Sequence, residues 1–111
     1  MNKVLLIGRL TADPEIMYGK NNTCIATFTV AVYRTPDETD FIRCRALGKT
    51  AEFVESGDFT KGKRVGLEGS WQTGSYENKN KETVYTNDCF VSRIEYADGK
   101  EEEKSKGGRR R

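Results

Sequence analysis

The chain has 111 residues, enough for one domain with a single core and too few for two comfortable domains. Charged residues make up 32% and apolar ones 35%; no apolar run is long enough for a membrane span, and the first ten residues lack a signal-peptide pattern, so we expect a soluble cytoplasmic protein. The net charge is only +2, and the 13 basic and 13 acidic side chains of residues 1–97 cancel, so a nucleic-acid site must be a local patch.

Three widely separated cysteines, Cys24, Cys44 and Cys89, occur without any CxxC pair, and the chain has no histidine. A zinc site needs four ligands at short spacings, so we expect no metal, no cofactor and three buried free thiols in a reducing compartment. The lack of histidine also removes the commonest general base. A catalytic function is therefore not expected.

The first predicted strand covers residues 3–10 and is apolar on both faces, with Val4 and Leu6 on one and Leu5 and Ile7 on the other. A strand of this kind is either central in a sheet or covered by another subunit, and in a small domain we favour the subunit. Residues 15–18 extend the pattern briefly before a turn at residues 19–23.

Residues 24–34 alternate cleanly, with Phe28 and Val30 on one face and Thr27 and Thr29 on the other. This alternation is typical of a strand with one buried face. The polar segment TPDETD at residues 35–40 predicts a turn, after which the next strand returns antiparallel.

That next strand, DFIRCRALG at residues 40–48, places Phe41, Arg43, Arg45 and Leu47 on one face. The other face, with Cys44 at its centre, is small and apolar. An aromatic ring followed by two arginines is typical of a surface that stacks bases and neutralises phosphates. This pattern predicts a nucleic-acid-binding β-barrel.

Residues 49–59 predict a short helix, with Ala51, Phe53 and Val54 grouped on its buried side and Gly57 ending it. Two longer strands then follow. The first, residues 61–76, has Val65, Leu67 and Trp71 on one face and Arg64, Glu68 and Gln72 on the other, with Gly66 and Gly69 permitting a sharp bend.

The polar loop ENKNKE at residues 77–82 leads to the last predicted strand, residues 83–96. Five strands with a helix between the third and fourth is the order of the OB-fold, an all-β Greek-key barrel. We therefore expect an OB-fold domain over residues 1–97. Residues 98–111 are charged and lack large apolar side chains, and we expect them to form a disordered tail.

Five blocks of the sequence together resemble the bacterial and phage single-stranded DNA-binding proteins. They are MNKVLLIGRLTADPEI, TFTVAVYR, DFIRCRALGKTAEFV, KGKRVGLEGSWQTGSYE and VYTND, and they follow one another in register over about residues 1–96. The resemblance implies a non-catalytic protein that binds and protects single-stranded DNA without sequence preference, in replication, recombination or repair. It also implies a homo-oligomer, a tetramer or else a dimer, with no membrane partner.

The resemblance further implies which residues contact DNA. Phe41 and Tyr76 match stacking aromatics, and Arg43 follows Phe41 where a phosphate-contacting residue is common. The basic groove residues that it implies are Lys3, Arg9, Lys49, Lys61 and Lys63. Apart from the resemblance, the further candidates are Arg34, Arg45, Lys79 and Tyr85. Lys79 lies in a loop whose lysines fit either the rim of a DNA groove or plain solvation.

Trp71 and Tyr33 are weaker candidates than the other aromatic residues. Trp71 lies where the family usually has an aliphatic residue and shares a face with Val65 and Leu67, so packing in the core or an interface is favoured over DNA contact. Tyr33 and Tyr85 are near strand ends, which leaves their facing open.

Three departures from the family limit the implied function. Leu47 stands where many members have an aromatic residue, which predicts one stacking platform fewer. The loop after Arg34 is short. The chain ends in KGGRRR instead of the family's acidic tip, so recruitment of partner proteins through such a tip is not expected.

Two other function classes remain as alternatives. One is an OB-fold protein-interaction module, such as a primosome-type accessory factor. The other is a small nuclease, against which stand the missing histidine and the lack of a convergent carboxylate cluster, because Asp37, Glu38 and Asp40 lie in one turn.

Overall fold

The computed structural model describes residues 1–97, so the tail expected at residues 98–111 lies outside the described part of the chain. Six strands, one α-helix and a single 3-10 turn follow one another along these residues. The elements are β1 (Val4–Leu10), β2 (Glu15–Tyr18), the 3-10 turn (Lys20–Asn22), β3 (Cys24–Thr35), β4 (Glu38–Leu47), α1 (Lys49–Ser56), β5 (Arg64–Glu77) and β6 (Thr83–Tyr96).

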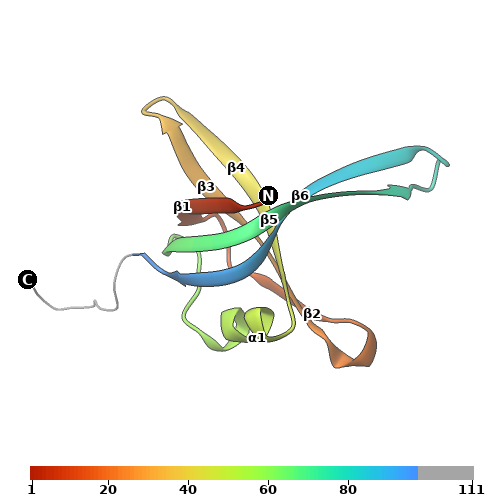
Figure 1. The fold of residues 1–111 in the computed structure, drawn as a ribbon, viewed down its shortest axis with the longest axis horizontal. Helices are drawn as coiled ribbons and strands as arrows, with labels where there is room; N and C mark the ends of the chain where they lie inside the picture. The colour runs from red at the N-terminus through yellow and green to blue at the C-terminus, as the bar shows by residue number, and fades with distance from the viewer. Residues whose placement is uncertain (98–111) are drawn as a thin grey trace, which may run out of the picture.

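Five of the strands close into a barrel in the order β1-β5-β6-β4-β3, and β1 returns to β3 where Arg9 pairs with Ala31 and Leu10 with Val30. The short β2 adds to the outside of this ring by pairing with β3. The helix α1 lies between the third and fourth barrel strands in sequence (Figure 1). The predicted OB-fold is confirmed.

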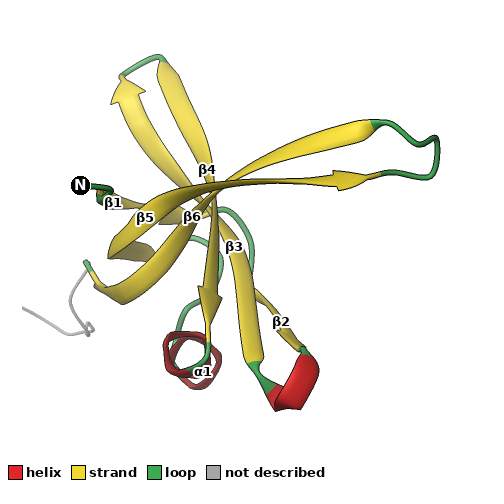
Figure 2. Ribbon diagram, turned by 45° about the vertical axis from the view of Figure 1, so that its right-hand side comes forward, coloured by secondary structure: helices red, strands yellow, loops and turns green. Residues whose placement is uncertain are grey.

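The core follows from the alternation along the strands. On β3, Cys24, Ala26, Phe28 and Val30 are buried, whereas the residues between them are partly exposed. The helix α1 contacts β3, β4 and β6, and it covers one end of the barrel in both ribbon views (Figures 1 and 2). The barrel is therefore filled by side chains and has no open interior.

The predicted buried side of α1 needs one correction. Ala51 and Val54 are buried, but Phe53 is 47% exposed. Phe59, which follows the helix, is buried instead and stacks on Tyr96 with ring centroids 4.4 Å apart. Phe59 fills the space beside the helix, so Phe53 reaches this aromatic pair only at its edge.

Two hairpins project beyond the barrel in different directions (Figure 2). The β3–β4 hairpin turns at Pro36 and Asp37 alone, a tighter turn than the predicted six-residue one, because Thr35 still belongs to β3 and Glu38 already to β4. The β5–β6 hairpin pairs without interruption from Gly69, which lies opposite Val91, to its loop. We call this part of the hairpin, residues 69–91, the arm.

A register shift between Glu68 and Gly69 leaves Ser92 as the extra residue of β6. Gly69 is required here because a Cβ atom at its position would lie 2.3 Å from the carbonyl oxygen of Phe90. The bend predicted from Gly66 and Gly69 thus depends on a bulge in the partner strand together with a close backbone approach at Gly69.

The three cysteines are free and buried, as predicted. Cys44 and Cys89 are neighbours on the parallel strands β4 and β6, and burial raises the pKa of both thiols, which keeps them protonated at neutral pH. Within residues 1–97 no three metal-binding side chains gather, and no helix is long and apolar enough to cross a membrane.

Candidate nucleic-acid interface

The outer face of β4 carries the side chains that the sequence placed there. Phe41 and Leu47 are 69% and 45% exposed, Arg43 is exposed and Arg45 is partly exposed, while the intervening Cys44 is fully buried. The predicted division of this strand into a buried face and an exposed face is confirmed.

The neighbouring strand β3 leaves this face open. Thr27 and Thr29 pair with Arg45 and Arg43, so only small hydroxyl side chains stand beside the two guanidinium groups. Farther along the hairpin, Tyr33 lies on the same face as Phe41, because Ala31 pairs with Phe41 and alternate residues share a face. Tyr33 is 76% exposed, which settles the facing that the sequence left open.

On its other side β4 pairs with β6 over only three residues, beginning with Cys44 opposite Cys89. Beyond this contact the arm leaves the barrel, and a groove of about 500 Å³ lies between it and β4. The groove is lined by Arg43, Arg45, Tyr76, Val84, Tyr85, Thr86, Asn87 and Asp88. Four predicted DNA-contacting residues from three strands therefore meet in one groove.

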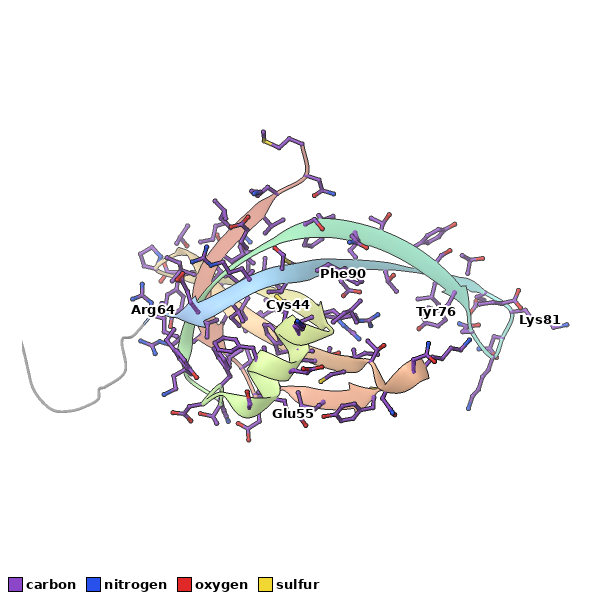
Figure 3. All side chains as sticks on the ribbon, turned by 60° about the horizontal axis from the view of Figure 1, so that its bottom comes forward. Cys44, Glu55, Arg64, Tyr76, Lys81 and Phe90 are labelled. Carbon is purple, nitrogen blue, oxygen red and sulfur yellow. The ribbon has the colours of Figure 1, made fainter. Side chains whose placement is uncertain are left out.

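The two tyrosines of the groove belong to opposite faces of the arm. Tyr76 pairs with Val84, whereas Tyr85 pairs with Ser75, so their side chains alternate. Both are largely exposed, Tyr76 at 57% and Tyr85 at 76%. Figure 3 shows Tyr76 toward the outer end of the arm, far from Phe90 at its base.

Each of the two arginines contacts a side chain of β6 that the sequence analysis did not identify as part of the site. The Nε atom of Arg43 lies 3.4 Å from the Oδ1 atom of the buried Asp88. The guanidinium of Arg45 lies over the ring of Phe90, 5.9 Å from its centroid, and its Nε atom is buried without a hydrogen-bond partner in the described residues. Contacts on one side of each guanidinium leave its other N–H groups for a ligand.

Asp88 and Phe90 lie in TNDCFV, where the buried Cys89 separates them. The alternation around Cys89 was a signal that both point outward beside β4. The parallel pairing of β6 with β4 is what makes them neighbours of the arginines, and sequence order does not reveal it.

A second hollow of about 260 Å³ continues from Arg43 toward the far side of β3. Its lining includes Thr29, Thr27 and Asp13, and the Asp13 carboxylate accepts a hydrogen bond from the backbone N–H of Lys61 at 2.8 Å. Lys61 is exposed beside this hollow. The contact face therefore runs from the arm across β4 and β3 toward the loop before β5.

Several predicted DNA-contacting lysines and arginines do not line the groove. Lys3 forms an ion pair of 2.7 Å with Glu68 of β5. Arg9 donates a hydrogen bond of 3.0 Å to the carbonyl of Gly62, and it pairs with Ala31, the residue of β3 that also pairs with Phe41, so Arg9 lies across β3 from Phe41 on the same face. These two residues stay predictions of DNA contact that the groove itself does not support.

The remaining candidates lie at the ends of elements. Lys49 is the exposed first residue of α1, and Lys63 pairs with Asp58 at 3.2 Å. Lys79 is exposed in the loop at the tip of the arm. None of these three lysines lines the groove.

Arg34 lies at the tip of the β3–β4 hairpin, where acidic neighbours engage it. Its guanidinium binds Asp40 at 2.9 Å and Glu38 at 3.3 Å. The Arg34 guanidinium lowers the pKa of the Asp40 carboxyl, so the pair stays ionised. Arg34 therefore contributes less positive charge to the contact face than the sequence indicated.

Trp71 is 40% exposed, so of its two predicted environments the core of its own chain is wrong, and packing in an interface stays a prediction. It continues the inward face of Val65 and Leu67 and pairs with the buried Cys89, but it follows Gly69, where the pairing of β5 with β1 ends. Its backbone is fixed to Asn2, whose side chain exchanges two hydrogen bonds of 2.8 Å with the Trp71 N–H and carbonyl.

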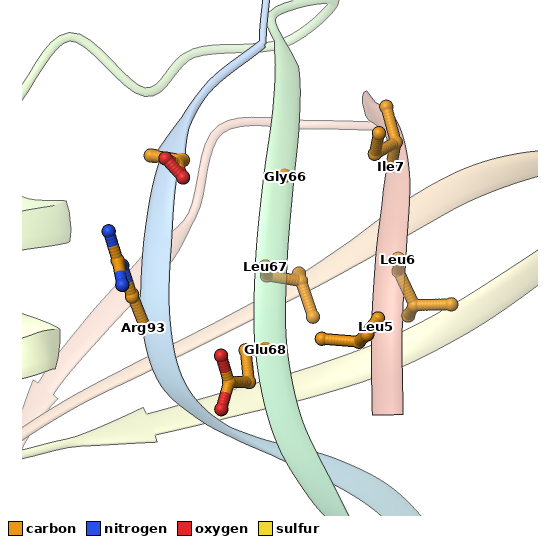
Figure 4. Close-up of a pocket in the computed structure, with 8 residues that line it drawn as sticks. Leu5, Leu6, Ile7, Gly66, Leu67, Glu68 and Arg93 are labelled. Carbon is orange, nitrogen blue, oxygen red and sulfur yellow. The ribbon is translucent and has the colours of Figure 1, made fainter. Parts of the chain in front are cut away.

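A different surface lies over β1, β5 and β6, where Leu5 and Ile7 are 69% and 56% exposed (Figure 4). They line a groove of about 420 Å³ with Gly66, Arg93, Glu95 and neighbouring residues. We call this the β1 groove. Lys3 lowers the pKa of Glu68 at its edge, so the charges there compensate one another. The strand β1 is thus central in the barrel and apolar on its outer face.

The comparisons with known proteins agree with this geometry. The model of the single-strand binding protein family matches residues 1–97. The single-stranded DNA-binding protein of Clostridium perfringens is 45% identical over 101 residues, which cover 88% of this chain and 67% of that protein. The single-stranded DNA-binding protein A of Bacillus subtilis is 37% identical over 106 residues, 90% of this chain and 61% of its own length.

The single-stranded DNA-binding protein of Lactiplantibacillus plantarum is 38% identical over 109 residues, which are 92% of this chain and 54% of that protein. The chain thus spans between 54% and 67% of the length of these relatives. The matched family consists of DNA-binding proteins that are not enzymes. With its five-stranded barrel and its exposed aromatic and arginine face, the chain belongs to the single-strand binding protein family.

Proposed function

We propose that the chain binds single-stranded DNA along the groove between β4 and the arm, and that it coats and protects the strand during replication, recombination or repair. The observation that carries this proposal is the meeting of Arg43, Arg45 and Tyr76 in one groove, with Phe41 exposed on the adjoining face of β4. Of the three hollows described above, only this groove is lined by two arginines and two exposed aromatic rings.

Each type of side chain has a separate task. Phe41 and Tyr76 stack on bases, and stacking contributes about 1–3 kcal/mol per base in proteins of this kind, whatever the base, because every base has a π-face. Arg43 and Arg45 neutralise phosphates, so affinity falls as salt rises. Tyr33 shares the face of Phe41 and extends this surface along β3.

The single-stranded DNA follows the exposed face from the arm across β4 and β3 toward Lys61. The threonines of β3 are small enough to let the backbone of the DNA approach the sheet. Leu47 ends the outward row on β4 without a ring, so contact there is apolar only. We therefore expect fewer stacked bases per subunit than in relatives that have an aromatic residue at this position.

We also propose that the chain forms a homo-oligomer through the β1 groove. Leu5 and Ile7 expose a contiguous apolar surface on a strand that pairs with β5 along most of its length and with β3 only at Arg9 and Leu10. Such a surface is typical of a face that another subunit covers. A tetramer is our first expectation and a dimer our second. The free thiols support a reducing cytoplasm, at the bacterial nucleoid or in the host cell of a phage.

The decisive experiment is a titration with oligo(dT) followed by intrinsic fluorescence over a range of salt concentrations. Trp71 is the one tryptophan of the chain and lies on the arm. Quenching with a steep dependence on salt supports the proposal, and no binding at low salt contradicts it. Incubation of labelled single strands with magnesium is the control, since cleavage would indicate a nuclease.

A further inference from the structure

Three apolar side chains form a row across the strands β2, β3 and β4. Met17 of β2 pairs with Ile25 of β3, and Ile25 pairs in turn with Leu47 of β4. Paired residues of adjacent strands lie on the same face of a sheet, so the three side chains stand next to one another. Met17 is 59% exposed, Leu47 is exposed as well, and Ile25 is partly exposed between them. We call these three residues the apolar row.

The apolar row lies on the same face of the sheet as the arginines of the groove. Leu47 is two residues from Arg45 on β4, and Ile25 is two residues from Thr27, the partner of Arg45 on β3. The buried Ala46 lies between Arg45 and Leu47 and points into the core. The row is therefore continuous with the surface that we propose for DNA.

The strand β2 is held in place by its other face. Ile16 packs against the core, and Tyr18 pairs with the buried Cys24 and donates a hydrogen bond from its hydroxyl to the carboxylate of Glu55 on α1. Met17 lies between these two residues and points away from both. A single exposed apolar side chain is ordinary, but three in contact beside an arginine form a surface that a ligand can cover.

The charges around the apolar row indicate which ligand fits it. Arg45, in the neighbouring row on β4, has N–H groups left for an anion. Glu15 of β2 pairs with Thr27 and would repel an anion on that side. A ligand that joins a flat apolar group to a negative charge therefore fits with its charge over β4 and its apolar group toward β2. A nucleotide combines these two groups.

We propose that the apolar row is a base-binding platform, on which one base of the bound strand lies across Leu47, Ile25 and Met17 with its phosphate toward Arg45. The inference rests on the proposed function and extends the DNA site to β2, the strand outside the barrel. The contact consists of dispersion and the burial of apolar surface, and a thioether packs well against an aromatic ring. Every base offers such a face, so no sequence preference follows.

The test measures the affinity of Met17→Ala for oligo(dT) over a range of salt concentrations. We expect binding about threefold weaker at every salt concentration, within the range of one sulfur–aromatic contact. The slope of log affinity against log salt should not change, because no phosphate contact is removed. Tyr18→Phe is the matched control on the same strand: it breaks the hydrogen bond to Glu55 on the opposite face and should bind like the unchanged chain.

A double-mutant cycle with Leu47→Ala tests whether both residues hold the same base. The double variant should bind within about twofold of the weaker single variant, because a base that has lost part of its platform has little more to lose. Unchanged affinity for Met17→Ala overturns the inference, as do a changed salt slope or losses that simply multiply. A lower oligomer mass for Met17→Ala in light scattering would assign the row to a subunit contact and overturn it too. Absence of binding by the unchanged chain contradicts the proposed function itself.

Discussion

Two grooves on the outside of the same barrel differ in chemistry. The groove between β4 and the arm is lined mostly by polar side chains, among them two arginines and one buried carboxylate. The β1 groove has Leu5, Ile7 and Gly66 at its centre and charges of both signs at its edges. The first surface has N–H donors left over for a charged ligand, whereas the second has nearly balanced charge around an apolar centre.

This difference separates two kinds of partner. Nucleic acid has many phosphates and planar bases, which can bind guanidinium groups that still have N–H donors available and can stack on exposed rings. A protein surface brings apolar side chains and paired charges, which suit Leu5 and Ile7 beside the Lys3–Glu68 ion pair. One closed sheet can therefore serve both, because alternation places every second residue of each strand outside.

The largest expected effect concerns the stacking residues of the first groove. Replacing both Phe41 and Tyr76 by alanine removes two platforms of about 1–3 kcal/mol each, so affinity for oligo(dT) falls at least about thirtyfold. Phe53→Ala is the matched control, because this ring is exposed on α1 away from the groove. The double variant retaining full affinity while folded would remove these residues from the binding site.

The next effect concerns the β1 groove. Leu5→Glu places an unpaired carboxylate in the proposed subunit contact, which weakens assembly by roughly tenfold or more because burying such a charge is costly. Light scattering after size-exclusion chromatography measures the change in mass. Met17→Glu, at an exposed position of β2, is the control and leaves the mass unaltered. Equal masses for the Leu5 variant and the unchanged chain would contradict the assignment of this groove to a subunit.

A smaller effect, on the salt dependence of the affinity, distinguishes the phosphate contacts of the arginines from the stacking of the rings. Arg43→Gln removes one phosphate contact and lowers the slope of log affinity against log salt by about one. Lys3→Gln, on the β1 side, leaves the slope unchanged if the first groove alone tracks the phosphates. An unaltered slope for Arg43→Gln, together with a reduced one for Lys3→Gln, would move the DNA path to the opposite surface.

The smallest effect is a dependence on pH at the edge of the β1 groove. Lys3 lowers the pKa of Glu68, so this ion pair stabilises the fold above the ordinary pKa of a glutamate, and the stabilisation is lost as pH falls through the lowered value. Glu68→Gln should flatten the decline of thermal stability in mild acid, as measured by circular dichroism. An identical decline in the variant would show that other carboxyl groups cause it.

The sequence predicted the barrel and the face of β4 because both depend on alternation within single strands. Cys44 and Ala46 mark the buried side of β4, and the arginines fall between them. The fate of Phe53 was not predictable in the same way, since its exposure depends on Phe59 taking the space beside α1. Trp71 shows the same limit, because the pairing of β5 with β1 ends at Gly69 and the alternating burial along β5 stops there.

The grouping of site residues was less predictable than their facing. The basic residues along the chain gave no indication of which of them line the groove. Closure of the barrel places Arg9 across β3 from Phe41, whereas Lys3 lies at the other end of β1, beside Glu68 of β5. Asp88 escaped detection for the same reason. Its neighbours on β4 are some 45 positions earlier in the chain, and only the parallel pairing of β4 with β6 brings them together.

That parallel pairing is short, at three residue pairs, and it forms a seam in the closed sheet. The β3–β4 hairpin lies on one side of the seam and the arm on the other. A ligand that contacts Arg43 and Tyr76 at once bridges it from outside and restrains its opening. We therefore expect the backbone amides of Arg45 and Phe90 to exchange with solvent more slowly once DNA fills the groove. Hydrogen exchange at these two amides thus reports directly how much of the groove is occupied by DNA.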